Sequence, residues 1–235
     1  MGIAEPYKSR KYEVAICVAG ITTEGRFRRI YAVPMKHYVC RPFKKFQYIS
    51  YNIIGRGDGR RESRKVDYSS IEPLKFASQS TVAEKIRNNT SPSLEYLHQR
   101  TKTSLGIIKP LEITNCKAER YCKRKTGHYT RLRAKTDHAI NIIPFWMKLD
   151  FLCRPSCNSH SIMCEDMEIG NYYRKFLLNN NSPEAMRKVD ERFVDFLKKY
   201  NPYFLVGTHK VYRNAWLIIS VINQKAEHFC FPLYV

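Results

Sequence analysis

Four side chains that suit a metal ion fall within one twelve-residue window of this chain. Cys153, Cys157, His160 and Cys164 have the spacing C-x3-C-x2-H-x3-C. Thiolate and imidazole groups are the ligands of tetrahedral Zn²⁺ sites. The residues Arg154-Pro155-Ser156 favour a loop that can turn all four side chains toward one centre. The window therefore predicts a structural Zn²⁺ site with four protein ligands and no open coordination position.

The fourth ligand of this site has alternatives. Cys164 also suits the role of a small buried hydrophobic residue at the start of a following helix. In that case Cys116, Cys122 or His128 would complete the site, because these residues form a second, looser Cys/His group. Two further alternatives are an iron–sulfur cluster, which the histidine makes less favoured, and no metal at all.

The charge of the chain indicates the kind of partner. The formal net charge is +20 and the isoelectric point is near 9.7. A charge of this size destabilises a compact state by self-repulsion, so it is typical of proteins that bind a polyanion. The aromatic content of 13% supplies surfaces for base stacking. We therefore expect a nucleic acid as partner. RNA or single-stranded DNA is favoured over duplex DNA, because the sequence contains no helix-turn-helix or basic-zipper pattern.

Two segments concentrate the cations that would contact phosphates. The first surrounds a glycine-rich loop and contains Arg56, Arg60, Arg61, Arg64 and Lys65. The second runs from Lys117 to Lys135, and its expected contacts are Lys117, Arg120, Lys123, Arg124, Lys125, Tyr129, Arg131 and Arg133. Each segment alone is typical of a solvated charged face, but two in one basic chain favour phosphate binding with tyrosine stacking. Further cations expected to extend this surface are Arg26, Arg28, Arg29, Lys44 and Lys45.

Acidic residues near these segments leave two alternative functions open. Glu62 and Asp166 stand among cations and would suit Mg²⁺ in a metal-dependent nuclease. No D…E-x-K spacing is present, and Glu165 to Glu168 suit the first turn of a helix, so we assign no catalytic residue. The other alternative is an RNA-contacting subunit of a larger ribonucleoprotein or defence complex, with other protein subunits as partners.

The sequence also predicts where the protein resides. The first ten residues contain no apolar signal segment, and no window of about 18 apolar residues suggests a membrane span. The eight cysteines do not resemble a secreted disulfide framework, and clustered cysteines in a reducing compartment bind metal more often than they pair. We therefore expect a cytoplasmic protein without a membrane partner.

Hydrophobic periodicity and turn residues predict the elements that position these side chains. Strands are expected over residues 14–21, 26–33, 43–54, 105–113, 203–206, 216–222 and 229–235. Helices are expected over residues 81–88, 93–102, 166–178 and 182–200. This succession predicts an α+β fold. Its expected regions are a β-rich N-terminal part (1–115) with a helical segment at 80–103, a basic loop or insertion (116–139), and a C-terminal α+β part (140–235) that carries the Cys/His cluster, two helices and closing strands.

Several short motifs resemble those of a functionally uncharacterised family of small prokaryotic proteins. Arg29-Ile30-Tyr31-Ala32-Val33-Pro34, Phe43-Lys44-Lys45-Phe46-Gln47-Tyr48-Ile49 and Arg61-Glu62-Ser63-Arg64 resemble its R-x-Y-P-V-P-F, F-K-K-x-Q-W-I and R-P-E-S-x-R motifs. Cys157-x2-His160, Asp166-Met167-Glu168-Ile169, Tyr203-Phe204-Leu205-Val206-Gly207-Thr208 and Trp216-Leu217-Ile218-Ile219 are similar to its C-x2-H…D-W-E-I…F-x-x-G-T…W-x-I-I-G ending. The resemblance implies one coherent fold and a Cys/His site. Three positions depart from it, namely Ala32, Met167 and Cys164, and the last puts Cys164 in doubt as a ligand.

Overall fold

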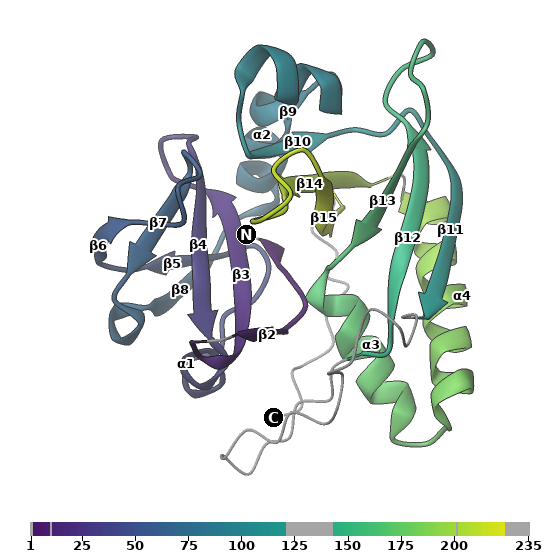
Figure 1. The fold of residues 1–235 in the computed structure, drawn as a ribbon, viewed down its shortest axis with the longest axis horizontal. Helices are drawn as coiled ribbons and strands as arrows, with labels where there is room; N and C mark the ends of the chain where they lie inside the picture. The colour runs from purple at the N-terminus through teal and green to yellow at the C-terminus, as the bar shows by residue number, and fades with distance from the viewer. Residues whose placement is uncertain (1, 10, 121–142, 201, 224–235) are drawn as a thin grey trace.

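The computed structural model describes residues 2–9, 11–120, 143–200 and 202–223. These residues form an α+β fold built on two large β-sheets, which lie side by side in Figure 1. The expected strand at 229–235 lies outside the described residues. In the part of the chain that is described, no helix is long and apolar enough to cross a membrane.

The first sheet is formed by the N-terminal strands. Its order is β1-β3-β4-β7-β6, with β2 added alongside β3, and only β4 and β7 pair in parallel. The strands are β1 (Gly2–Ile3), β2 (Tyr7–Ser9), β3 (Glu13–Ile21), β4 (Phe27–Pro34), β6 (Ile53–Arg56) and β7 (Ser63–Val66). The turn between β3 and β4 uses Gly25 at a φ of +81°, a conformation that glycine adopts without steric cost.

Smaller elements cover the first sheet. The helix α1 (Met35–Cys40) follows β4 directly, and β5 (Gln47–Ser50) pairs with β8 (Glu72–Phe76) as a separate two-stranded sheet. A 3₁₀ turn at Tyr68–Ser70 precedes β8. The helix α2 (Gln79–Asn89) then begins at Ser78, whose hydroxyl accepts a hydrogen bond from the backbone N–H of Thr81 and caps the helix.

The second sheet has seven strands in the order β11-β12-β13-β15-β14-β10-β9. Their bounds are β9 (Thr90–Ser91), β10 (Leu105–Ile108), β11 (Glu112–Arg120), β12 (Phe145–Leu152), β13 (His160–Cys164), β14 (Tyr203–Thr208) and β15 (Trp216–Ile222). In β12 the residues Phe145, Met147, Leu149 and Phe151 are fully buried, and those between them are half-exposed. This alternation is what a strand with one buried face requires. A π-helical turn, Tyr96–Thr101, joins β9 to β10.

Two helices cover one face of this second sheet. The helix α3 (Met167–Leu177) begins at Asp166, whose carboxylate accepts a hydrogen bond from the N–H of Glu168 at 3.1 Å. The helix α4 (Ser182–Tyr200) begins after Asn181, whose side chain caps the N–H of Glu184, and Pro183 occupies the favoured first turn. Val189, Phe193, Phe196 and Leu197 bury one face of α4 against the sheet. Figure 1 shows both helices packed beside β11, β12 and β13.

The two sheets share a core. One hydrophobic cluster joins Ala19 of β3, Ile86 of α2, Ile107 of β10 and Leu205 of β14. β1 adds to this contact, because the chain continues from it to Ala4, which bridges to Asp166 at the start of α3. The N-terminal sheet is therefore held against the C-terminal part by apolar packing as well as by backbone hydrogen bonds.

The structure corrects several of the expected elements. The expected strand 43–54 is two strands, β5 and β6, which belong to different sheets. The expected helix 93–102 is helical over residues 94–101, but most of it is the π-helical turn Tyr96–Thr101, and the Ser93 hydroxyl before it accepts from the N–H of Tyr96. Lys117 and Arg120, expected in a loop, lie in β11. The expected strand 105–113 is also two strands, β10 and the start of β11, which lie apart in the second sheet. The other expected elements among the described residues appear close to their expected bounds.

Candidate metal centre and basic surface

Three of the four expected ligands meet at one end of the second sheet. Cys153 directly follows β12, Cys157 lies in the loop, and His160 is the first residue of β13, opposite Phe151. The Cys157 Sγ lies 3.1 Å from the His160 Nε2, and the ligand atoms of the three residues all lie within 4.8 Å of one another. Cys153, Cys157 and His160 therefore form a cluster that is able to hold a metal ion.

The loop between β12 and β13 brings the cluster together. The N–H of Cys157 donates to the carbonyl of Arg154 at 3.0 Å, which closes a tight turn. The ring of His160 packs on the ring of Phe151, with centroids 5.3 Å apart. The antiparallel pairing of the two strands thus returns His160 to the position of Cys153, as the spacing of the motif requires.

Burial disfavours the charged form of the Cys153 thiol. It raises the pKa of Cys153 to about 11, and the neighbouring Cys157 acts in the same direction. A bound cation would stabilise the thiolate and offset this cost. All six described cysteines, Cys17, Cys40, Cys116, Cys153, Cys157 and Cys164, are free thiols, in accord with the expectation that the chain is no disulfide framework.

The structure does not bring Cys164 to this cluster. Cys164 is the last residue of β13 and His160 the first, so their Cα atoms lie about 13 Å apart at a strand rise of about 3.3 Å per residue. Cys164 is buried, and desolvation raises its pKa well above the usual thiol value. Cys116 pairs with Leu149, four residues before Cys153, and is similarly remote. Cys122 and His128 lie outside the described residues.

Three arginines gather on one face of the first sheet. Arg56 of β6 stands directly opposite Arg64 of β7, and Arg64 pairs in turn with Ile30, two residues from Arg28 on β4. Because alternate residues of a strand share a face, Arg28, Arg56 and Arg64 point to the same side, here named the arginine face. Tyr51 lies near it, since the charges of Arg28 and Arg64 lower its pKa against the larger effect of burial.

No ion pair neutralises the arginine face within the described part of the chain. The side chains of Arg28 and Arg64 donate to backbone carbonyls, namely those of Phe27, Arg61 and Ser63. Neighbouring cations Arg61 and Lys65 are exposed. The surface is therefore positive without an internal carboxylate to balance it.

Three of the expected phosphate contacts are buried instead. Arg60 pairs with Asp58, and its guanidinium donates to the carbonyl of Thr208 in β14 at 2.6 Å. Arg29 donates to the Ser104 carbonyl at 2.7 Å, and Lys45 bonds to Asp166 and Glu168 at 3.0 and 2.8 Å. These three cations connect the two sheets, so they are not available to a ligand.

The second basic segment is only partly described. Lys117 and Arg120 are exposed on β11, and Lys117 pairs with Glu119 at 3.1 Å. The other expected contacts, Lys123, Arg124, Lys125, Tyr129, Arg131 and Arg133, lie outside the described residues. The arginine face is therefore the basic surface on which a site can be built.

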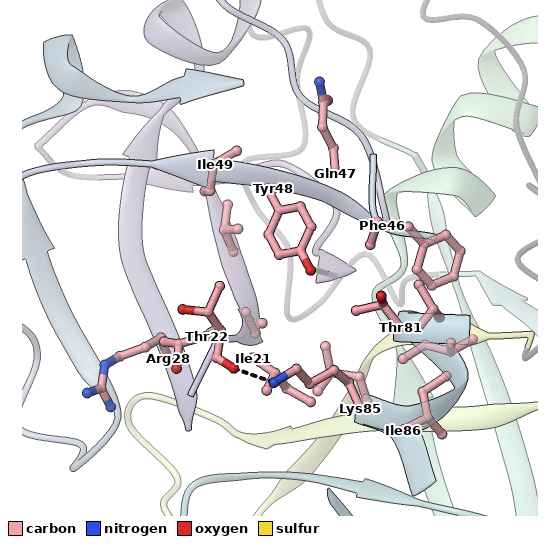
Figure 2. Close-up of a pocket in the computed structure, with 18 of the residues that line it drawn as sticks. Ile21, Thr22, Arg28, Phe46, Gln47, Tyr48, Ile49, Thr81, Lys85 and Ile86 are labelled. Atoms are coloured by element: carbon pink, nitrogen blue, oxygen red, sulfur yellow. Dashed lines mark hydrogen bonds between the residues drawn. The ribbon is translucent and has the colours of Figure 1, made fainter. Parts of the chain in front are cut away.

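A cavity of about 420 Å³ opens beside the arginine face. Ile21, Ile49 and Ile86 contribute to its mostly apolar wall, and Arg28 and Tyr51 stand at its edge. Figure 2 shows the Tyr48 hydroxyl pointing into the space between β3 and α2, while the Arg28 guanidinium turns away from it. Lys85 crosses the cavity floor and donates to the Thr23 carbonyl.

The carboxylates considered for a nuclease already have internal partners. Glu62 is buried and accepts from the N–H and hydroxyl of Ser104 at 3.1 and 2.5 Å. Asp166 accepts from Lys45, from Ser220 and from the N–H of Val221 at 2.8–3.0 Å. Buried carboxylates so occupied hold elements together, and they offer few free lone pairs to a metal and its substrate.

Two models of known protein families match parts of the chain. Residues 1–92 match a family described as "Domain of unknown function (DUF8758)", and residues 87–232 match one described as "Domain of unknown function (DUF8757)". The second match covers more than half of the sequence. The chain belongs to the DUF8757 family. Searches among curated proteins and among solved structures gave no significant match.

The two matched regions are joined by buried polar contacts. The DUF8758 and DUF8757 matches meet at residues 87–92, at the end of α2. Lys45 of the first region is buried against Asp166 and Glu168 of the second. The metal cluster lies wholly in the DUF8757 region, whereas the arginine face belongs to the DUF8758 region.

Sequence reasoning missed two features of these sites. The role of Tyr48 in a cavity was not visible, because the cavity forms only when β5 packs over β3 and α2. Glu95, whose Oε1 lies 3.3 Å from the His160 Nε2, is distant in sequence from the cysteine motif. The one available signal was an acidic side chain in the expected helix 93–102, which is too common a feature to single it out.

Proposed function

We propose that this protein binds single-stranded nucleic acid, RNA or single-stranded DNA, through the arginine face and the adjoining cavity. A Zn²⁺ ion at Cys153, Cys157 and His160 holds the C-terminal part together in this proposal. The observation that carries the proposal is the placement of Arg56 directly opposite Arg64, beside Arg28, with no ion pair to a carboxylate among the described residues.

Such a placement is unfavourable for the folded protein alone. Like charges directly opposite each other on neighbouring strands destabilise the pairing. A phosphate backbone would neutralise the arginines and release its condensed counterions, so the same arrangement becomes favourable on binding. Arginine also suits this role because its planar guanidinium donates two parallel hydrogen bonds to phosphate oxygens.

The cavity is the reason to favour a single strand over a duplex. Its volume of about 420 Å³ lies within the roughly 300–1,000 Å³ of pockets that hold small ligands. An unpaired base can leave the strand and stack against Tyr48 or Phe46, while its phosphates stay on the arginine face. A paired base inside a duplex cannot enter such a pocket without first being flipped out.

Zinc is the metal that suits the cluster best. Two thiolates and one imidazole are soft and borderline ligands that Zn²⁺ prefers, while Mg²⁺ and Ca²⁺ prefer oxygen. The cluster fastens the loop between β12 and β13, away from the arginine face in sequence and in sheet. A structural role therefore fits better than one in contact with the nucleic acid.

Fluorescence anisotropy with labelled oligonucleotides tests the proposed binding. We expect the protein to bind a short single-stranded RNA or DNA more tightly than a duplex of the same length. The triple variant Arg28→Gln, Arg56→Gln and Arg64→Gln should lose most of this affinity. Tyr48→Ala should weaken single-strand binding more than duplex binding, because only an unpaired base can reach the cavity.

Two matched variants provide the controls. Arg187→Gln removes an arginine of α4 that pairs with Glu184 and Glu191, and Tyr212→Ala removes an exposed tyrosine that does not line the cavity. Both should bind like the wild type. If the wild type does not bind single strands, or if the triple variant binds as tightly as Arg187→Gln, the proposed surface is wrong.

A further inference from the structure

The carboxylate of Glu95 faces the metal cluster from another part of the chain. Its Oε1 lies 3.3 Å from the His160 Nε2, the same ring nitrogen that lies 3.1 Å from the Cys157 Sγ. Two ligand-type atoms, a carboxylate oxygen and a thiol sulfur, thus converge on one nitrogen. Glu95 is not among the three residues whose ligand atoms all lie within 4.8 Å of one another, so its side chain would have to turn about this contact to bring an oxygen to the two sulfurs as well.

The second oxygen of Glu95 has no partner in the described structure. The Oε2 is buried, yet no hydrogen bond reaches it, although the side chain as a whole is 36% exposed. A buried carboxylate oxygen without a donor destabilises the folded state, because it has lost its hydration and gained no hydrogen bond in return. Such an atom is usually explained by a role that the apo structure does not display.

The segment that carries Glu95 is held firmly against the cluster. A hydrogen bond from the backbone of the preceding residue, Leu94, lowers the pKa of Cys153 against the larger effect of burial. Leu97 is buried on Gly106 of β10 so closely that a Cβ there would lie 2.5 Å from the leucine Cδ1. The π-helical turn therefore has little freedom to move Glu95 away from the loop after β12.

We infer that Glu95 supplies the fourth ligand of the metal centre, which is then built from Cys153, Cys157, His160 and Glu95. The inference rests on the metal site of the proposed function and completes it. A closed structural zinc site takes four protein ligands, and carboxylate oxygen is an accepted ligand beside sulfur and nitrogen. Cys164 and Cys116 cannot take this place, because each is about four strand residues away from the cluster.

The charges of the four ligands are compatible with Zn²⁺. Binding releases the two thiol protons to solvent, leaves the imidazole neutral and uses a carboxylate that is already ionised. The site then carries one net negative charge. Arg154, which is exposed in the loop directly after Cys153, is a cation beside the site that can balance this charge.

The consequence is a link between distant segments. Glu95 belongs to the turn that leads into β10, whereas the other ligands belong to the loop joining β12 to β13. β10 and β13 are separated in the sheet by β15 and β14. Metal binding would therefore fasten together segments that the sheet alone leaves apart, and it would stabilise the folded state because the site exists only in the folded chain.

Metal affinity of Glu95 variants tests this inference. Zn²⁺ affinity is measured on the full chain by competition with a chromophoric chelator. Glu95→Gln should lower the affinity at least about tenfold, because loss of a ligand should cost no less than the 10- to 100-fold typical of outer-shell changes. Glu84→Gln, at an exposed position of α2, should leave it unchanged. Cys157→Ser should abolish tight binding.

Cobalt spectra locate the fourth ligand independently. The Co²⁺-loaded Glu95→Cys variant should show stronger thiolate-to-metal charge-transfer absorption than the wild type, because a third thiolate replaces the carboxylate. If the wild type binds metal but Glu95→Gln binds as tightly as Glu84→Gln, or Glu95→Cys leaves the spectrum unchanged, the inference is wrong and the three-ligand site remains. If the wild type binds neither Zn²⁺ nor Co²⁺, the proposed metal site and the inference about Glu95 are both wrong.

Discussion

Glu165 is a half-buried residue that lies between the end of β13 and the helix cap Asp166. Its backbone is fully used, since its N–H donates to Ile218 and its carbonyl accepts from Glu5. Burial raises the pKa of Glu165 to about 7, the neighbouring Glu5 carboxylate acts in the same direction, and Arg29 acts against them. The side chain is therefore protonated in the folded protein at pH values where it is ionised in the unfolded chain.

This difference predicts a pH dependence of stability. Between about pH 4.3, the usual glutamate pKa, and about pH 7, the folded state holds a proton that the unfolded chain has released. The free energy of unfolding should therefore fall as the pH rises through this window. Glu165→Gln removes the contribution, and it should make the protein more stable than the wild type above pH 7, by on the order of 2–3 kcal/mol.

Urea unfolding at a series of pH values measures this effect. The curve of stability against pH should be flatter for Glu165→Gln than for the wild type, and Glu84→Gln should follow the wild type. Parallel curves for Glu165→Gln and the wild type would show that Glu165 does not titrate in this range.

At the residue scale, the sequence predicted ligands only where they are near one another in the chain. Cys153, Cys157 and His160 were predictable because a loop and one strand pairing bring them together. The spacing of the motif alone did not exclude Cys164 as a metal ligand. Four residues span about 6 Å in a helix but about 13 Å in a strand, and the motif does not say which element follows His160.

At the element scale, the contact of the segment after α1 with α3 is the clearest structural link. Lys45 is 7% exposed, and its Nζ donates to Asp166 at 3.0 Å, to Glu168 at 2.8 Å and to the carbonyl of Val221 at 3.1 Å. The two carboxylates raise the pKa of Lys45 against desolvation, so the amine stays charged. The three groups form a buried network in which each charge has a partner.

Removal of this lysine should therefore be costly. Lys45→Met keeps the apolar part of the side chain but leaves the carboxylates of Asp166 and Glu168 without a cation. This change is expected to lower the free energy of unfolding by about 3–5 kcal/mol. Chemical unfolding measures the loss. The matched control is Lys44→Met, because Lys44 is the exposed neighbour. A loss for Lys45→Met no larger than for Lys44→Met would mean that the network contributes nothing to stability.

Most elements could be predicted from periodicity, whereas their sheet membership could not. The helices α2, α3 and α4 and the strands β3, β4 and β15 show the expected patterns of buried residues and capping side chains. The segment 43–54 is uniformly rich in aromatic and β-branched residues, but β5 pairs with β8 and β6 with β7. Pairing depends on long-range contacts that no local pattern encodes.

At the scale of the whole molecule, the basic residues form two groups with different roles. Arg29, Lys45 and Arg60 lie buried between the N-terminal sheet and the C-terminal part, where carboxylates or carbonyls engage them. Arg28, Arg56 and Arg64 lie on the arginine face and form no ion pair with a carboxylate among the described residues, although Arg28 and Arg64 donate to nearby backbone carbonyls. Net charge predicted a polyanion partner, but only the fold separates the cations that join the sheets from those that remain for a ligand.

The salt dependence of binding tests the central proposal most directly. For single strands, the logarithm of the affinity falls with the logarithm of salt concentration by about 0.7 per neutralised phosphate, so three arginines account for a slope of about 2. We predict that the triple variant Arg28→Gln, Arg56→Gln and Arg64→Gln shows a slope shallower than the wild type by about 2. Arg187→Gln should keep the wild-type slope. Equal slopes for the wild type and the triple variant would contradict the assignment of the arginine face as the nucleic-acid surface.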